Sequence, residues 1–230
     1  MSALLEIKAR AVVFDAVGTL IAPAVPVAET YAAVARREGV EVSPRLIASR
    51  FRRALQRLDR VDGRTNEQVE RDAWRSIVSE CLPEVADASA AFEALWRHYA
   101  RPESWTVYSD VQPALANLAA GGVRLGVASN FDARLRAVVR GHPELTLVEN
   151  QVWVCSELGY RKPAPEFFWE VARELGLRAS DVLYVGDDAA HDAEAPRAIG
   201  MQACLLRRGA ATGDFGGSIE TLMDLRVKCA

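Results

Sequence analysis

Lysine, cysteine and long apolar runs are scarce in this sequence, and each scarcity excludes a class of protein. The 28 basic and 31 acidic residues give a net charge of −3 and are well mixed, so nothing indicates a nucleic-acid surface or a polybasic membrane patch. No run approaches the roughly 20 apolar residues that cross a bilayer. The first fifteen residues carry charges where a secretory leader has its apolar segment. We therefore expect no membrane and no nucleic acid as partner.

The four cysteines, Cys81, Cys155, Cys204 and Cys229, are scattered without C-x-x-C spacing. Two of them lie in apolar, strand-like runs. This distribution is typical of free buried thiols in a reducing compartment. We therefore expect a cytoplasmic protein.

Short apolar runs alternate with helical patterns over most of the chain. The runs that predict strands span residues 11–17, 123–129, 151–155, 181–187 and 202–207. Continuous apolar runs of this kind indicate strands buried on both faces, as in a parallel sheet covered by helices. Helices are predicted at 163–175, which has proline near its first turn, and at 191–200, which ends at Gly200. The pattern predicts an α/β fold.

Residues 23–105 have a different pattern, with no convincing strand. Four amphipathic helices are predicted there, at residues 27–39, 44–58, 66–82 (with Thr65 as N-cap) and 88–100. An all-helical block that follows the first strand of an α/β sheet is best interpreted as a separate small domain. We therefore predict a core domain from residues 1–22 and 106–230 and an inserted helical domain from residues 23–105.

Polar residues follow several of the predicted strands. They are Asp15, Gly18 and Thr19 after the first strand, Ser129 and Asn130 at the end of the second, Lys162 after the third, and Asp187, Asp188 and Asp192 after the fourth. In an open parallel sheet, ligands bind beyond the carboxyl ends of the strands. We expect these side chains to meet at that edge.

Carboxylates gathered at one edge repel each other, so a cation is expected among them. A few hard oxygen ligands, with room for water and phosphate, favour Mg²⁺ over zinc. Lys162, a hydroxyl group and backbone N–H groups suit a dianionic phosphate. The chain has only three lysines, and one of them stands beside the proline that begins a helix. The order and spacing of these groups predict a magnesium and phosphate site.

This joint pattern resembles the haloacid dehalogenase superfamily of phosphohydrolases. The matching motifs are FDAVGTL, VASN, the lysine of RKP and the acidic segment GDDAAHD. The resemblance implies a Rossmann-like three-layer core with a parallel sheet, and a helical cap at residues 23–105. It implies a small phosphorylated molecule as substrate, bound by a monomer or a homodimer.

The resemblance also assigns roles to residues. Asp15 would be the nucleophile that forms an aspartyl-phosphate, with Lys162 as the second catalytic group. The phosphate would be bound by Thr19, Ser129, Asn130 and Lys162. The Mg²⁺ ligands would be Asp15, the backbone carbonyl of Val17, Asp187 and Asp192. Glu157, which comes before the lysine loop in sequence, would support the residues that bind the ligand.

Val17 departs from the pattern of the family's phosphatases, which have an acid at this position to protonate the leaving group and activate water. Three alternatives follow: a phosphatase that is slow or uses another proton carrier such as His191, a phosphate-binding or interaction protein on the same scaffold, and a 2-haloacid dehalogenase. The acidic GDDAAHD segment disfavours the dehalogenase, which needs no metal. A phosphonate hydrolase is excluded because it needs a lysine from the cap, and residues 23–105 contain none. We favour the phosphatase.

The sequence leaves the substrate open, because cap residues select it. Trp74, Trp96 and Trp105 are candidates to line a pocket, although aromatic residues at such spacing usually pack a helical core.

Overall fold

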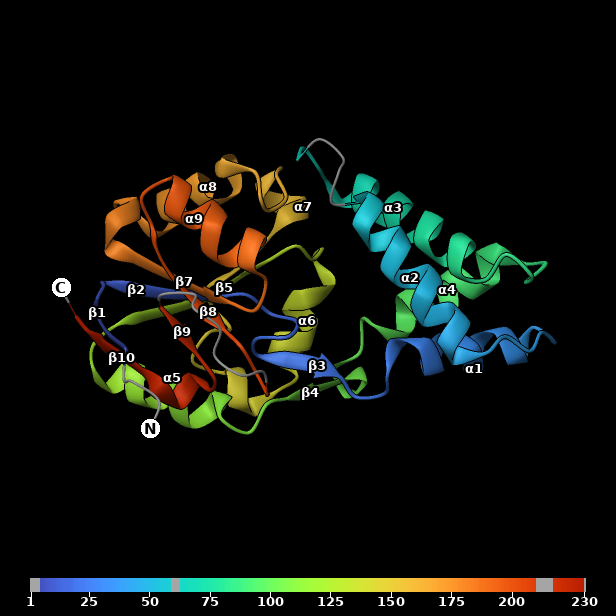
Figure 1. The fold of residues 1–230 in the computed structure, drawn as a ribbon, viewed down its shortest axis with the longest axis horizontal. Helices are drawn as coiled ribbons and strands as arrows, with labels where there is room; N and C mark the ends of the chain where they lie inside the picture. The colour runs from blue at the N-terminus through green and yellow to red at the C-terminus, as the bar shows by residue number, and fades with distance from the viewer. Residues whose placement is uncertain (1–4, 59–62, 210–216, 230) are drawn as a thin grey trace.

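A six-stranded parallel sheet forms the centre of the larger lobe (Figure 1). The computed structural model describes residues 5–58, 63–209 and 217–229. The strands are β2 (Ala11–Phe14), β5 (Arg124–Ser129), β6 (Val152–Val154), β7 (Val182–Gly186), β8 (Gln202–Leu206) and β9 (Ser218–Ile219). Each predicted strand is present, and the prediction of an α/β fold with a parallel sheet is confirmed.

The strand order is β6-β5-β2-β7-β8-β9, so β2 lies in the middle of the sheet. Phe14 at the end of β2 pairs with Val127 of β5 on one side and with Val185 of β7 on the other. All these pairings are parallel. The carboxyl ends of β2, β5 and β7 therefore lie side by side at one edge of the sheet.

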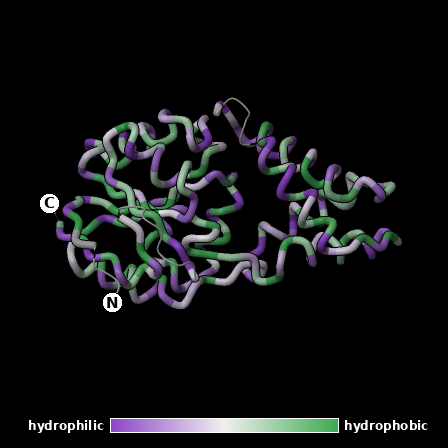
Figure 2. The backbone as a smooth tube through the Cα atoms, viewed as in Figure 1, coloured by the Kyte–Doolittle hydropathy of each residue, from purple (hydrophilic) through white to green (hydrophobic). Residues whose placement is uncertain are grey.

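Helices cover both faces of the sheet, as the continuous apolar strands require. The helices of this lobe are α5 (Val111–Ala120), α6 (Arg134–Arg140), α7 (Cys155–Leu158), α8 (Pro165–Leu175) and α9 (Ala195–Ala198). Val12 and Phe14 pack in one apolar cluster with residues of α5 and α6, and Val13 packs in another with residues of α8. Figure 2 shows hydrophobic colouring along the central strands.

Four helices form a smaller lobe, which we term the helical module (residues 27–98). They are α1 (Val27–Arg37), α2 (Pro44–Leu58), α3 (Glu67–Cys81) and α4 (Ala88–His98). The module has its own apolar core around Tyr31, Ile47 and Phe92. Its placement beside the sheet lobe is seen in Figure 1. The domain limits at residues 22/23 and 105/106 stay a prediction.

Some local expectations are wrong. Asn66, not Thr65, caps α3, with its side chain accepting a hydrogen bond from Val69 N at 3.0 Å. The Thr65 hydroxyl instead donates to Glu70 within the helix. The range 191–200 is a π-helical turn, η4 (Ala189–Glu194), followed by α9, although Gly200 does follow the helix with φ +85°.

Strands were also missed outside the main sheet. β3 (Ile21–Pro23) pairs antiparallel with β4 (Trp105–Val107), so the expectation of a strand-free 23–105 is wrong at both of its ends. This ribbon joins the two lobes. β1 (Leu5–Lys8) pairs with β10 (Leu225–Lys228) in a separate two-stranded sheet. All four runs are only three or four residues long, and β1 and β10 also carry charges, which hides them from a search for apolar periodicity.

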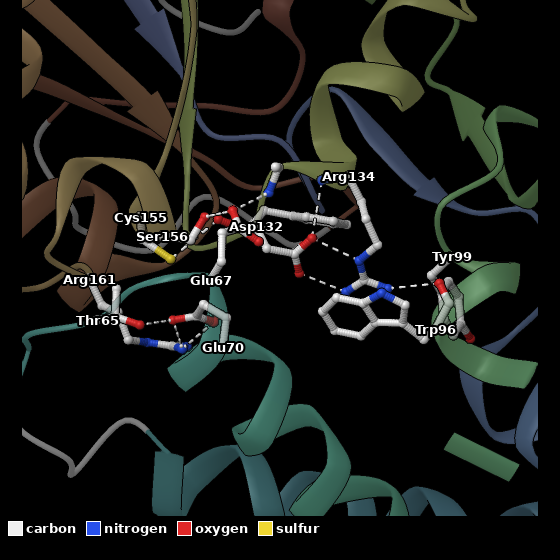
Figure 3. Close-up of polar contacts among 12 residues, drawn as sticks. Thr65, Glu67, Glu70, Trp96, Tyr99, Asp132, Arg134, Cys155, Ser156 and Arg161 are labelled. Atoms are coloured by element: carbon white, nitrogen blue, oxygen red, sulfur yellow. Dashed lines mark hydrogen bonds and ion pairs between the residues drawn. The ribbon is translucent and has the colours of Figure 1, made fainter. Parts of the chain in front are cut away.

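The helical module touches the sheet lobe at a second place, before and within α3 (Figure 3). Thr65 N donates to Gly159 O at 3.0 Å, and Arg161 N donates to Gly63 O at 2.6 Å. Glu70 is fully buried, and its two carboxylate oxygens each lie 2.7 Å from Arg161 Nη1. The module is thus fastened to the backbone just before Lys162.

The buried Glu70–Arg161 pair makes a testable contribution to stability. We expect Glu70→Ala to lower the free energy of unfolding by about 3–5 kcal/mol, because it leaves a buried guanidinium without its counter-charge. The control is Glu41→Ala, which breaks the exposed Arg36–Glu41 pair and is expected to cost at most about 1 kcal/mol. Urea unfolding followed by circular dichroism measures both. Equal losses in the two variants would contradict the assignment.

Candidate active site at the carboxyl ends of the strands

Three carboxylates converge at the edge of the sheet. Asp15 follows β2, Asp187 follows β7, and Asp192 lies in η4. One oxygen from each lies within 4.8 Å of the others. Asp15 and Asp192 are buried, with exposed fractions of 6% and 1%. The structure therefore brings together the three acids that the sequence placed at separate strand ends.

The ammonium of Lys162 lies between two of these acids. Lys162 Nζ is 2.7 Å from Asp15 Oδ1 and 2.6 Å from Asp192 Oδ1, and the side chain is buried. Burial by itself lowers the pKa of Lys162, but the charges of Asp15 and Asp192 more than offset it, so this pKa stands well above its usual range. The lysine is charged at every physiological pH.

Lys162 is held in place from several sides. Asn130 Nδ2 donates to Lys162 O at 2.9 Å, and Asn130 Oδ1 accepts from Lys162 N at 2.7 Å. The ring centroid of Tyr184, a residue that the sequence did not single out, lies 5.4 Å from Nζ. The Asn130 amide thus fixes the lysine backbone, while Ser129 Oγ, at 2.9 Å, donates directly to Asp15 Oδ1.

Two glycines allow the carboxylates to approach the backbone. A Cβ on Gly18, which has φ +89°, would lie 2.4 Å from an Asp187 oxygen, and a Cβ on Gly186 would lie 2.3 Å from Asp192 Cγ. Any side chain at either position would displace an acid of the cluster. The sequence signals of this constraint are Gly18 after the first strand and the Gly-Asp dipeptide of residues 186–187.

Close packing explains the protonation behaviour of Asp187. The residue borders open solvent, yet its carboxylate lies against Gly18 and accepts a hydrogen bond from Thr19 Oγ1 at 3.3 Å. The resulting loss of hydration, followed by the negative charges of Asp15 and Asp192, raises the pKa of Asp187 to about 7. Burial likewise raises the pKa of Asp15, against the opposing effect of Lys162.

The remaining candidates lie at varying distances from this cluster. Thr19 is fully buried and its hydroxyl donates to Asp187, so it supports an acid directly. Asp188 caps η4 by accepting from His191 N at 2.8 Å, and its Oδ1 lies 3.1 Å from His191 Nδ1. His191, the alternative proton carrier, is partly buried. Glu157 is exposed and pairs with Arg136, away from the supporting role that the resemblance implies.

The donor set fits Mg²⁺. When all three carboxylates are ionised, they and the one ammonium leave two negative charges in a largely buried cluster, which a divalent cation would balance. All the side-chain ligands are hard oxygens, which Mg²⁺ prefers. Asp15, Asp187 and Asp192 could hold the ion. Val17 lies two residues after Asp15 in the same loop and is 36% exposed.

Comparisons with known proteins agree with this geometry. A model of the haloacid dehalogenase-like hydrolase family matches residues 9–200. Human haloacid dehalogenase-like hydrolase domain-containing protein 3 is 30% identical over 211 residues, which are 87% of this chain and 83% of the human protein. Glyceraldehyde 3-phosphate phosphatase of Methanopyrus kandleri is 30% identical over 125 residues, 54% of this chain and 52% of that protein.

Among solved structures, the defluorinating L-2-haloacid dehalogenase Rha0230 matches with a TM-score of 0.73 and 22% identity, covering 94% of this chain and 93% of that one. At this identity the likeness shows the fold alone. The family model and the human relative both extend over most of the sequence. The chain belongs to the haloacid dehalogenase-like hydrolase family.

Proposed function

We propose that this protein is a Mg²⁺-dependent phosphatase that transfers the phosphoryl group of a small phosphate ester to Asp15. The observation that carries the proposal is the convergence of Asp15, Asp187 and Asp192 within 4.8 Å, with Lys162 Nζ bound to two of them. A cluster of this composition suits a divalent cation and a dianionic phosphate together. The relative from Methanopyrus kandleri, named a phosphatase, supports the same assignment.

Asp15 is the nucleophile in this proposal. Ser129 and Lys162 both donate to Oδ1, which fixes the carboxylate and assigns the attack on phosphorus to Oδ2. The new Oδ2–P bond forms as the bond from phosphorus to the leaving oxygen breaks. The ammonium of Lys162 stabilises negative charge on the transferring phosphoryl oxygens. A bound Mg²⁺, with Asp15, Asp187, Asp192 and the Val17 carbonyl as ligands, would polarise the phosphoryl group.

Val17 decides which step is slow. A valine neither protonates a leaving oxygen nor activates water, and general acid–base catalysis contributes on the order of 10²–10⁴-fold to rate. Hydrolysis of the aspartyl-phosphate should suffer most, because it needs an activated water. His191 is a poor replacement for the acid missing at position 17, since its Nδ1 faces Asp188.

Val17 also favours a second candidate function, a phosphate-binding or interaction protein that has kept the scaffold but lost turnover. The dehalogenase stands third, because it gives no reason for three acids to gather around one point. In all three cases we propose that the segment predicted as residues 23–105, which contains the helical module, is the cap over the site. Location in the cytoplasm and a monomeric or dimeric state stay predictions. No helix within the described ranges is long and apolar enough to cross a membrane.

A covalent intermediate on Asp15 should accumulate. With 4-nitrophenyl phosphate and Mg²⁺, we expect a burst of nitrophenol close to one equivalent per active site, because this leaving group needs little protonation. Rapid mixing measures the burst, and mass spectrometry after acid quench measures a phosphoryl adduct that Asp15→Asn lacks. Linear release from the first turnover without an adduct would contradict the mechanism. Binding of phosphate without any release would favour the scaffold protein.

Restoring an acid at position 17 should restore turnover. We expect Val17→Asp to raise the steady-state rate with 4-nitrophenyl phosphate at least about ten-fold, a conservative share of the general acid–base contribution. Val17→Asn is the matched control, because it is similar in shape but carries no titratable proton. If both variants remain at the wild-type rate and fold normally, the missing acid is not what limits turnover.

Asp187 should be needed for the metal. We expect Asp187→Asn to weaken Mg²⁺ binding by about 10–100-fold or more, measured by calorimetry. Asp188→Asn, which removes the same charge one residue away, should change it little. Because the pKa of Asp187 is raised to about 7, protons compete with Mg²⁺, and wild-type affinity should fall between pH 8 and pH 6. Equal affinities in the two variants would remove Asp187 from the site.

A further inference from the structure

A cavity of about 240 Å³ lies between the helical module and the sheet lobe, next to the carboxylate cluster. Fourteen of its sixteen lining residues are aliphatic or aromatic, and the aromatic ones include Tyr31, Phe51, Trp74, Trp96, Trp105 and Phe131. The three tryptophans that the sequence offered as pocket candidates all line it. Its lining also includes Val17 and Asn130, so the cavity begins where the phosphate site ends.

The charged residue and the amide residue of the lining, Arg134 and Asn130, already have partners, whereas the Tyr99 hydroxyl has none among the described residues. Arg134 forms a two-pronged ion pair with Asp132, at 2.7 Å to each oxygen. The same guanidinium lies 3.3 Å from the ring centroid of Trp96 and donates to Trp96 O (Figure 3). The Asn130 amide binds the backbone of Lys162. No carboxylate or imidazole is among the residues that line the cavity.

We propose that this cavity binds the leaving group of the substrate, and that this group is an uncharged aryl group of one or two rings. The proposal rests on the phosphatase function above and adds the substrate class. A charged or strongly polar group would lose its hydration in the cavity without finding a free counter-charge, which is costly. An aromatic ring loses little hydration free energy in the cavity and gains contacts with the surrounding rings.

The size of the cavity sets the upper limit on the group. A cavity of about 150 Å³ is enough to hold benzene. The 240 Å³ measured here therefore accommodates a single substituted ring or a fused pair. A sugar or a nucleoside of similar volume carries several hydroxyl or amide groups, more than the Tyr31 and Tyr99 hydroxyls of this lining can pair with.

The lack of an acid at position 17 favours the same class of substrate, the aryl phosphates. Val17 lines the cavity at the point where the ester oxygen would leave, and it supplies no proton. An aryl oxygen leaves as a phenolate far more readily than an alkyl oxygen leaves as an alkoxide. The shape of the cavity and the lack of an acid thus favour aryl phosphates over alkyl phosphates independently.

Two aryl phosphates of similar leaving-group acidity test the cavity. We expect kcat/KM for 2-naphthyl phosphate to exceed that for phenyl phosphate at least about ten-fold, because the second ring buries further apolar surface. We also expect 2-naphthol, which has no phosphate, to bind and change the tryptophan fluorescence, with or without Mg²⁺. Acetyl phosphate, which is activated but leaves the cavity empty, tests the phosphatase function alone.

Two matched variants on α2 test whether the preference for the naphthyl ester arises in the cavity. Leu55 lines the cavity, whereas Leu46 on the same helix is 42% exposed and does not. Leu55→Gln should weaken 2-naphthol binding and remove most of the naphthyl preference, and Leu46→Gln should leave both unchanged. Phosphate release from acetyl phosphate with no 2-naphthol binding and equal rates for both aryl esters would overturn the cavity proposal alone. Binding of 2-naphthol without release of phosphate from any ester would overturn the phosphatase function and leave the cavity as an aryl-binding site.

Discussion

The position of one ammonium group governs the site. Asp15, Asp187 and Asp192 lie close enough to repel strongly in a partly dehydrated environment. Lys162 Nζ, within 2.7 Å of both buried acids, makes their proximity tolerable, and its own charge is maintained by them. The lysine is in turn held by the Asn130 amide through its backbone. Each member of the group thus depends on the others, and the cluster still carries an excess of negative charge that suits a divalent cation.

The fold brings these residues together through two features. The parallel register places the ends of β2, β5 and β7 side by side, which delivers Asp15, Ser129 and Asp187 to one edge. Lys162 comes from farther away, in a loop whose preceding residues pair with the backbone of the helical module at Gly63 and Thr65. The lobe that closes the aromatic cavity is therefore also attached to the loop that carries the lysine. A shift of the helical module would therefore move the loop that carries Lys162 and alter the charge cluster.

Much of this could be predicted from the sequence, because strands buried on both faces are apolar throughout and their polar ends stand out. Asp15, Asp187 and Asp192 were found in this way. Glu70 and Arg161 were not, since they lie 91 residues apart and nothing in the local pattern links them. The place of Glu157 just before the lysine loop likewise suggests a supporting role in the site, but its side chain is exposed and pairs with Arg136. Contacts between the lobes depend on packing that periodicity does not encode.

The apolar cavity changes the expected effect of the missing acid at position 17 on the rate, because that effect depends on the leaving group. For an alkyl ester, losing general acid–base catalysis costs about 3–5 kcal/mol of barrier, more than the about 1.5–3 kcal/mol that burial of a valine-sized group contributes. For an aryl ester, departure of the leaving oxygen needs little protonation. The barrier added by the missing acid is then smaller than the free energy gained from apolar contact with the leaving group. Val17 then extends the cavity lining up to the ester oxygen, and only the hydrolysis of the aspartyl-phosphate remains slow. An acid at this position would speed that hydrolysis but would place a charge at the mouth of a cavity lined by aromatic rings.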